Sequence, residues 1–387
     1  MFARTKYFFY AVATLIGYIV GAGIFGVPFV MQSLGFIPAL ILMLVISGFT
    51  VINLLSLTEV ILRTRGNHFL PGLANVYQGK AGKWFQFAAA IIGNYGALLA
   101  YLVLGGIFLK NLASPWLEFC PGVQEYFFVL LFCALGILFI WRGSEELGLA
   151  EFIMLAILIA IVLLIAFKSA PQIQAQNYLG INPNHFLPAF GVFIFALDGL
   201  GCIFIVKQIL KKRERLIKKT VLITYGIVSL IFFCFAASLV GVFGQDINQE
   251  AIIGIGQKLG QDIEFFATIF GFLAIFSSFV VIGSSLKNTL ETDFKIPHSL
   301  SWLMVWTAPL ILYFLGFNNF IEIIALIGIV FGTINTLVIA GLLKKARQEK
   351  KRKPEFTLGL PLWINYSISF IYFIAMIYEI SRFMAFI

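Results

Sequence analysis

Two short segments combine helix-breaking residues with an apolar setting, and the first is GYIVGAGIFGVPFV at residues 17–30. It holds four glycines and one proline. Each glycine weakens a helix by about 1 kcal/mol relative to alanine, and Pro28 cannot donate to the preceding turn, so we expect unwinding around residues 21–26. The opened backbone would offer N–H groups to a carboxylate and carbonyl groups to an ammonium or a metal cation. A zwitterionic amino acid carries both charges. Alternatively, Gly17 and Gly21 form a GxxxG spacing that serves only close helix packing.

The second segment, FGVFIFALDGLGCIFIV at residues 190–206, places an acid in a glycine-rich apolar run. Asp198 is the only acid that the predicted spans put near mid-depth, where a charge is costly and usually functional. Gly199 and Gly201 would let it lie in unwound backbone. Two interpretations stay open: Asp198 contacts the substrate ammonium or takes part in proton coupling, or it caps a half-helix.

A third segment, AIFSSFVVIGSS at residues 274–285, carries hydroxyls at helical spacing. Ser277 and Ser278, with the carbonyls of Gly17 and Val20, could supply the oxygen ligands that a small cation needs. Serine hydroxyls also bond back to their own helix, so both interpretations stay open. Further along the chain, the four cysteines show no close pairing and no histidine neighbours, so we expect neither a disulfide nor a metal site from them.

The elements that must position these residues are membrane helices. The hydrophobic fraction is 60%, the mean hydropathy is +0.98, and only 12% of residues are charged. This composition predicts an all-α polytopic membrane protein. Apolar runs near the roughly 20 residues that cross a bilayer recur along the chain. We expect about eleven transmembrane helices, at residues 7–34, 37–62, 84–112, 125–141, 149–167, 187–207, 220–243, 263–287, 299–316, 319–343 and 360–383.

The formal charge of +9 follows from topology rather than from nucleic-acid binding, because no stretch could form a soluble domain with a basic face. With a cytoplasmic N-terminus, 23 of the 27 basic residues lie in inner segments, a strong positive-inside bias. We therefore expect a multi-pass protein of the cell (inner) membrane with its N-terminus in the cytoplasm. The four basic residues left outside are Lys110, Lys168, Lys258 and Arg382.

The predicted helices divide into two halves. Repeat one covers about 7–167 and repeat two about 187–343, with an extra helix at about 360–383, all within a single transmembrane domain, 1–387. Five crossings are an odd number, so the second copy must be inverted. Interrupted helices at matching positions of inverted halves indicate the binding site of a secondary transporter.

Three motifs carry a resemblance to a known family: IGYIVGAGIFGVPFVMQSLGF, IFALDGLG and AIFSSFVVIGSSLKNTLETDF. They are similar to the first-, sixth- and eighth-helix regions of the amino acid/auxin permease family, and of its hydroxy and aromatic amino acid permeases, in the amino acid-polyamine-organocation superfamily. The resemblance implies a LeuT-type 5+5 inverted repeat with discontinuous helices 1 and 6 and alternating access. Asp198 stands where proton-coupled relatives have glutamate, and the fifth helix lacks a lysine that some of them carry, so a proton or sodium stays open as coupling ion.

By this resemblance, the substrate carboxylate would meet the amides of residues 21–23, and the ammonium the carbonyls of residues 19, 195 and 196. We expect import of a neutral amino acid by symport, with aromatic and hydroxylated amino acids as candidates and without a cofactor. A sensor or channel is the alternative, and a membrane-embedded enzyme fits less well because all three histidines lie in loops or at helix edges. Which amino acid is bound and the oligomeric state are left open. The expected substrate-binding residues are Ile19, Gly21, Ala22, Gly23, Ile24, Tyr95, Tyr101, Phe195, Ala196, Asp198 and Gly199, and the candidate sodium site is Gly17, Val20, Ala274, Ser277 and Ser278.

Overall fold

The computed structural model describes residues 2–66, 68–113, 123–142, 147–211 and 213–384. Within these ranges every regular element is helical. The long helices are α3 (Phe36–Arg63), α4 (Leu70–Ala113), α5 (Val123–Arg142), α6 (Leu147–Ser169), α9 (Ile217–Phe243), α11 (Gln261–Phe294), α12 (His298–Phe314), α13 (Phe320–Glu349) and α14 (Leu362–Met384). The shorter helices are α1 (Phe2–Ile19), α2 (Gly23–Leu34), α7 (Phe186–Ala196), α8 (Ile203–Ile209) and α10 (Gly256–Leu259).

Each of the predicted spans corresponds to one helix or to a pair of helices. By length and composition, eight helices of the described ranges can cross a membrane, and the bent pair α1/α2 would make nine. The helix α12 has only 17 residues, and α7 and α8 are shorter still. The prediction of an all-helical, multi-pass membrane protein is confirmed, while these criteria alone support eight or nine spans rather than eleven.

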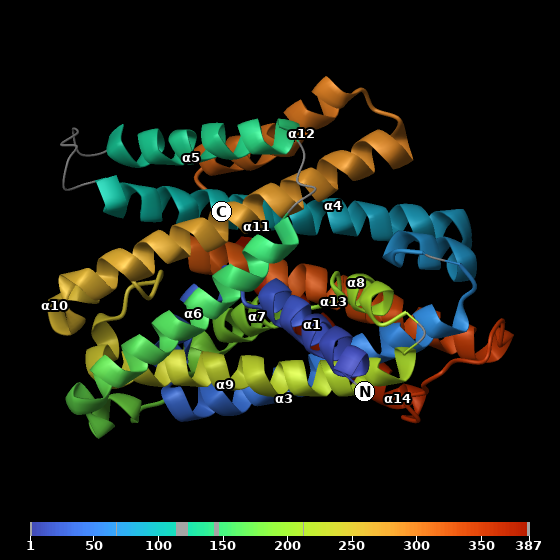
Figure 1. Cartoon of the computed structure of the whole chain (residues 1–387), viewed down its shortest axis with the longest axis horizontal. Helices are drawn as coiled ribbons and strands as arrows, with labels where there is room; N and C mark the ends of the chain where they lie inside the picture. Colours follow the sequence, from blue (N-terminus) through green and yellow to red (C-terminus); the bar gives the residue numbers. More distant parts are fainter. Residues whose placement is uncertain (1, 67, 114–122, 143–146, 212, 385–387) are drawn as a thin grey trace.

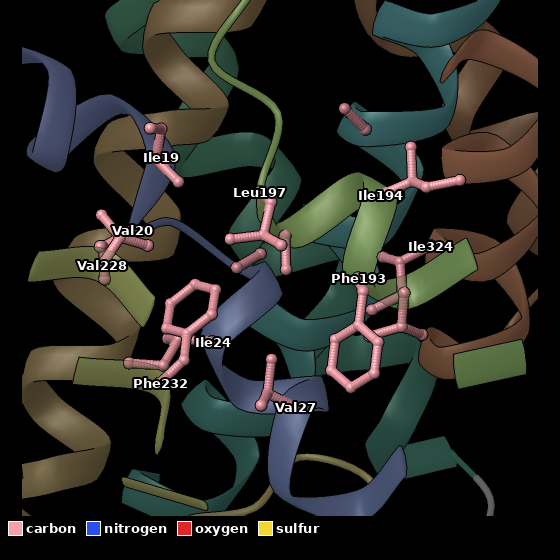
Figure 2. Packing of buried hydrophobic residues seen from close by; sticks show 14 of the residues in the cluster. Ile19, Val20, Ile24, Val27, Phe193, Ile194, Leu197, Val228, Phe232 and Ile324 are labelled. Carbon is pink, nitrogen blue, oxygen red and sulfur yellow. The ribbon is translucent and has the colours of Figure 1, made fainter. Parts of the chain in front are cut away.

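The broken helices occupy the middle of the molecule. In the view of Figure 1, α1, α7 and α8 lie between α4 and α11 on one side and α3 and α9 on the other. The helix α7 packs against α2 and α13, and α4 packs against α11 and α13. Figure 2 shows how apolar side chains of α2, α7, α9 and α13, such as Ile24, Phe193, Phe232 and Ile324, fill the space beside the breaks.

The first break is narrower than the sequence predicts. Only residues 20–22 lie outside the two helices, and α1 and α2 meet there at 60°. Gly23 and Gly26 lie inside α2, where they make room for neighbours rather than unwinding the chain. A Cβ atom on Gly23 would lie 2.5 Å from Ala196 Cβ, and one on Gly26 would lie 3.0 Å from Ile324 Cδ1. Packing against α7 and α13 therefore restores the helix that glycine propensity alone would open.

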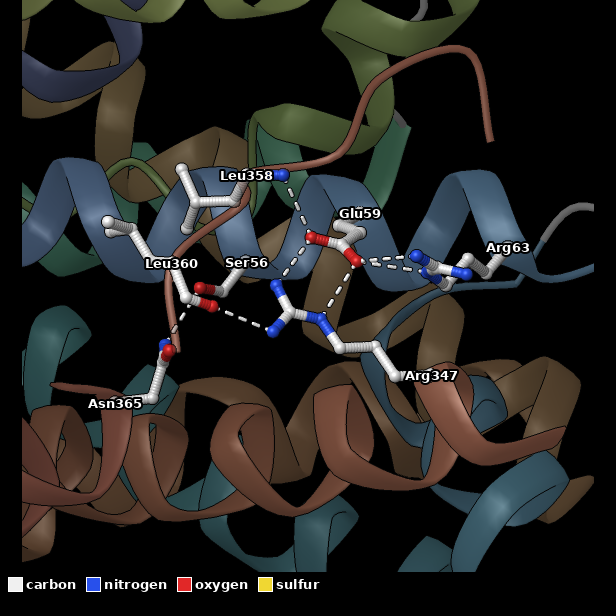
Figure 3. Close-up of polar contacts among 7 residues, drawn as sticks. All are labelled: Ser56, Glu59, Arg63, Arg347, Leu358, Leu360 and Asn365. Atoms are coloured by element: carbon white, nitrogen blue, oxygen red, sulfur yellow. Dashed lines mark hydrogen bonds and ion pairs between the residues drawn. The ribbon is translucent and has the colours of Figure 1, made fainter. Parts of the chain in front are cut away.

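One end of the bundle, here called the basic end, carries the C-termini of α3 and α13, the start of α4, and the connection from α13 to α14. This connection, residues 350–361, is here called the strap. Its contacts centre on Glu59 of α3, whose side chain is 0% exposed. Glu59 accepts hydrogen bonds from Arg63 and Arg347 and from the backbone N–H of Leu358 at 2.9–3.0 Å (Figure 3). A single carboxylate thus joins α3, α13 and the strap.

Candidate functional site

The two breaks lie against each other at the centre of the molecule. Besides the contact of Gly23 with Ala196, a Cβ atom on Gly199 would lie 3.2 Å from Ile19 Cδ1. One on Gly201 would collide with the Tyr18 hydroxyl. Glycine at these positions lets the backbone of the second break lie directly against side chains at the end of α1. Segments from the two halves of the chain meet here, as the paired glycine-rich motifs predict.

The first break leaves two backbone donors free. Gly21 N–H donates to Ile19 O at 2.9 Å, so this amide is already used. In the described part of the chain, the N–H groups of Ala22 and Gly23 have no intramolecular acceptor, as expected for the first turn of a helix. Of the three amides expected to meet a carboxylate, two are free, and they lie at the positive end of the α2 dipole.

The second break, residues 197–202, is held open by specific bonds. Leu200 N–H donates to Asp198 Oδ1 at 3.2 Å, and Tyr225 Oη of α9 donates to Leu197 O at 2.8 Å. The Asp198 carboxylate therefore bonds to an amide inside the break and does not cap the first turn of α8. The Tyr225 hydroxyl thus gives the Leu197 carbonyl a hydrogen-bond donor, which the unwound backbone would otherwise leave it without.

A cavity of about 650 Å³ begins at the breaks and extends toward the basic end. Around the breaks its wall includes Tyr101 of α4, Phe195 and Asp198. Toward the basic end, the wall is formed by Phe69 and Leu70 beside the start of α4, by Gln208 of α8, and by Thr289 near the end of α11. On the other side of the breaks the rings of Phe25 and Phe108 pack edge to face, with their centroids 5.2 Å apart.

Most of the predicted site residues line this cavity, and four do not. Ile24 and Ala196 are each 1% exposed in the core, and Gly199 is packed against Tyr225 and Ile19. Tyr95 faces away, since its hydroxyl donates to Met304 O of α12 at 3.1 Å. The predicted residues that line the cavity are Gly17, Ile19, Val20, Gly21, Ala22, Gly23, Tyr101, Phe195, Asp198, Ala274, Ser277 and Ser278.

The serines of α11 differ from the threonines on the same helix. Thr268 and Thr289 donate to the carbonyl four residues earlier, at 2.7 and 2.8 Å. In the described residues Ser277 and Ser278 make no such bond, although both line the cavity. Ser278 Oγ would lie 3.9 Å from a Cβ atom on Gly21, which places it beside the first break. These hydroxyls remain available to a ligand or a cation.

Sequence reasoning missed the polar residues that support the site from neighbouring helices. Tyr225 was not singled out, nor was the pair Gln86 of α4 and Asn335 of α13, in which Gln86 Nε2 donates to Asn335 Oδ1 at 2.8 Å. Both amides line the cavity, and Gln86 Oε1 is buried without a partner in the described residues. The available signal was a polar side chain in the middle of an apolar helix, which is costly unless it has a partner.

Comparison with known proteins supplies a separate line of information. Residues 4–379 match the model of the tryptophan/tyrosine permease family. The chain is 22% identical to tyrosine-specific transport system 1 of Haemophilus influenzae, over 87% of this chain and 88% of the relative. It is 21% identical to amino acid transporter AVT3C of Arabidopsis thaliana, over 80% and 76% of the two chains. It is also 20% identical to glutamine transporter 2 of Aliivibrio fischeri, over 82% and 83%.

Proposed function

We propose that this chain, which belongs to the tryptophan/tyrosine permease family and is thus a membrane permease rather than an enzyme, imports a neutral amino acid by gradient-driven symport. The observation that carries the proposal is the meeting of two interrupted helices beside a cavity that both breaks line. Two relatives, tyrosine-specific transport system 1 and glutamine transporter 2, are named for the transport of an amino acid, which supports an amino acid as the substrate.

In this proposal the substrate's charged ends bind to backbone groups. The carboxylate accepts from the free N–H groups of Ala22 and Gly23, where the α2 dipole adds attraction. The ammonium lies near the carbonyls of Ile19 and Phe195 and the carboxylate of Asp198. Because the bilayer core contains no water to bind such groups, a site with both charges would select a zwitterion over a simple ion.

The fold proposed for this mechanism is the LeuT-type inverted repeat, with repeats at about 7–167 and 187–343 and an extra helix at 360–383. It counts α1/α2 and α7/α8 as interrupted spans, which together with α12 raises the number of crossings to eleven. The cavity's extension toward the basic end agrees with an inward-facing state, in which the basic end is cytoplasmic under the positive-inside rule.

The coupling ion is proposed to bind near the substrate. Ser277, Ser278 and the carbonyls of Gly17, Val20 and Ala274 offer oxygen atoms for sodium, and Asp198 offers a proton-binding carboxylate. The free hydroxyls of the two serines support a sodium route. In the described residues no basic side chain is bonded to Asp198, which supports a proton route. The uptake experiment under separate pH and sodium gradients distinguishes the two coupling ions.

Uptake by proteoliposomes tests the proposal. Purified protein is reconstituted, and accumulation of labelled tyrosine, tryptophan and glutamine is measured under an imposed pH gradient, an imposed sodium gradient, and neither. We expect saturable accumulation of at least one amino acid under one gradient. No saturable flux of any amino acid under either gradient would contradict the proposed function.

The role of Asp198 is tested by Asp198→Asn. If the carboxylate takes part in coupling, gradient-driven accumulation should be lost. The matched control is Asp262→Asn, the same chemical change at an exposed position in the first turn of α11, which should accumulate substrate as the unaltered protein does. Normal accumulation by Asp198→Asn would assign Asp198 to shaping the break through its bond to Leu200 N–H.

A further inference from the structure

The strap forms one wall of a second pocket, which lies outside the transport cavity. It has a volume of about 480 Å³ and combines the end of α3 with the connection between α13 and α14. Four of its eight lining residues are basic and one is acidic. The lining residues are Arg63, Lys350, Arg352, Lys353, Pro354, Glu355, Phe356 and Thr357.

The charges around this pocket do not cancel. Glu355 is bonded to Arg352, and Glu59 is shared between Arg63 and Arg347. Five basic side chains thus face two carboxylates, which leaves a net charge of +3. Lys350 and Lys353 are exposed, and in the described residues neither makes a salt bridge. An unneutralised cluster of this kind attracts an anion.

The backbone holds these cations in place. Lys350 ends α13 in the left-handed conformation, with φ of 45°, and turns the chain back across α3. The Leu358 N–H bond to Glu59 and the Arg347 Nη1 bond to Leu360 O at 2.8 Å then fix the far end of the strap (Figure 3). Lys218 Nζ of α9 lies over the Phe356 ring, 5.6 Å from its centroid, and this contact holds the middle of the strap. The pocket is therefore a formed feature of the fold.

The position of the pocket matches the level of lipid headgroups. Trp363, in the first turn of α14, closely follows the strap and is 66% exposed. Such exposure is expected of an aromatic residue at the membrane interface. Guanidinium groups match phosphate oxygens in geometry, and basic pockets between membrane helices on the cytoplasmic side bind anionic headgroups.

We propose that the pocket between the end of α3 and the strap binds a phosphate group, supplied by an anionic phospholipid of the adjacent leaflet. The phosphate lies among Arg63, Lys350, Arg352 and Lys353. Binding ties the strap to α3 and so stabilises the basic end of the bundle. The proposal does not depend on which amino acid is transported.

The test is thermal stability of the purified full-length protein in neutral detergent, titrated with one of three probes. They are short-chain phosphatidylglycerol, phosphatidylcholine of the same chain length, and inorganic phosphate. We expect phosphatidylglycerol to raise the unfolding temperature in a saturable manner, because a ligand of the folded state stabilises it, and phosphatidylcholine to have no such effect. Saturation by inorganic phosphate at similar concentrations would support the same anion site with a soluble source.

Two double variants that each remove two positive charges distinguish binding in this pocket from general electrostatic attraction to the protein. Lys350→Asn with Lys353→Gln removes the unpaired pocket lysines, and asparagine tolerates the left-handed conformation at position 350. Its midpoint for phosphatidylglycerol should rise roughly 30-fold, given the usual contribution of each basic residue near anionic lipid. The control, Lys80→Gln with Lys344→Gln, changes basic residues outside the pocket and should keep the original midpoint.

Three results would overturn the proposal: no stabilisation by any anionic probe, equal stabilisation by phosphatidylcholine, or equal weakening in the two double variants. Each would mean that the basic residues of the strap serve membrane orientation only. Native mass spectrometry gives a second measurement that does not depend on folding stability. Retained phosphatidylglycerol should be reduced in the pocket variant and not in the control.

Discussion

The buried carboxylate of Glu59 offers the sharpest test of how the basic end is held together. It is 0% exposed and accepts from two guanidinium groups and one backbone N–H. In Glu59→Gln the side chain keeps its shape, but one oxygen becomes an NH₂ group that faces other donors. Arg347, whose side chain is 23% exposed, loses its charge partner while most of its side chain stays buried.

The expected loss can be worked from these contacts. Each oxygen of Glu59 accepts from at least two donors, so converting one oxygen to a donor removes about two hydrogen bonds to a charged group. At about 1.5–3 kcal/mol for each such bond, the free energy of unfolding falls by about 3–6 kcal/mol, a range that includes the usual cost of about 3–5 kcal/mol for breaking a buried ion pair.

The assay is denaturant unfolding in micelles, with Glu349→Gln as the matched control. Glu349 is 40% exposed and pairs with Lys351. Loss of such a surface pair should cost less than about 1 kcal/mol. A local measurement accompanies it: trypsin should cut the strap after Lys351 or Arg352 faster in Glu59→Gln than in the control. Equal stability and equal cleavage of the two variants would refute the assignment of Glu59 as the residue that joins α3, α13 and the strap.

Two further substitutions test the breaks themselves. Gly23→Ala places a methyl group against Ala196 and should lower the free energy of unfolding by about 1–3 kcal/mol and reduce uptake, whereas Gly48→Ala, with open space around it, should not destabilise the fold. Tyr225→Phe leaves Leu197 O without a donor and should cost about 1–3 kcal/mol in unfolding free energy. Its control Tyr366→Phe, at an exposed position, should change that free energy by less than about 0.5 kcal/mol. The free energy of unfolding of each variant and its control is measured in the same micelles, and uptake is also measured for the two glycine variants. If a variant and its control show equal effects, the assigned contacts are contradicted.

The sequence determined the membrane class and the places where helices break. Hydropathy over spans of about 20 residues is a local property, so each predicted segment corresponds to one helix or to a pair of helices. The paired glycine motifs likewise indicated both breaks, because glycine weakens a helix wherever it lies. The length of the first break, in contrast, is not a local property. Because Gly23 packs against Ala196, α2 begins at residue 23, whereas the glycine content predicts unwinding as far as residue 26.

Tertiary structure alone decided which polar groups meet. In the sequence Glu59 lies near the end of the span predicted at residues 37–62, yet its partner Arg347 lies 288 residues away. Tyr95 and Tyr101 share one helix and similar surroundings in sequence, but only Tyr101 lines the cavity. A hydrogen bond depends on the orientation of two side chains from separate helices, and this is fixed by how the helices pack. The spacing of residues along either helix does not contain that information.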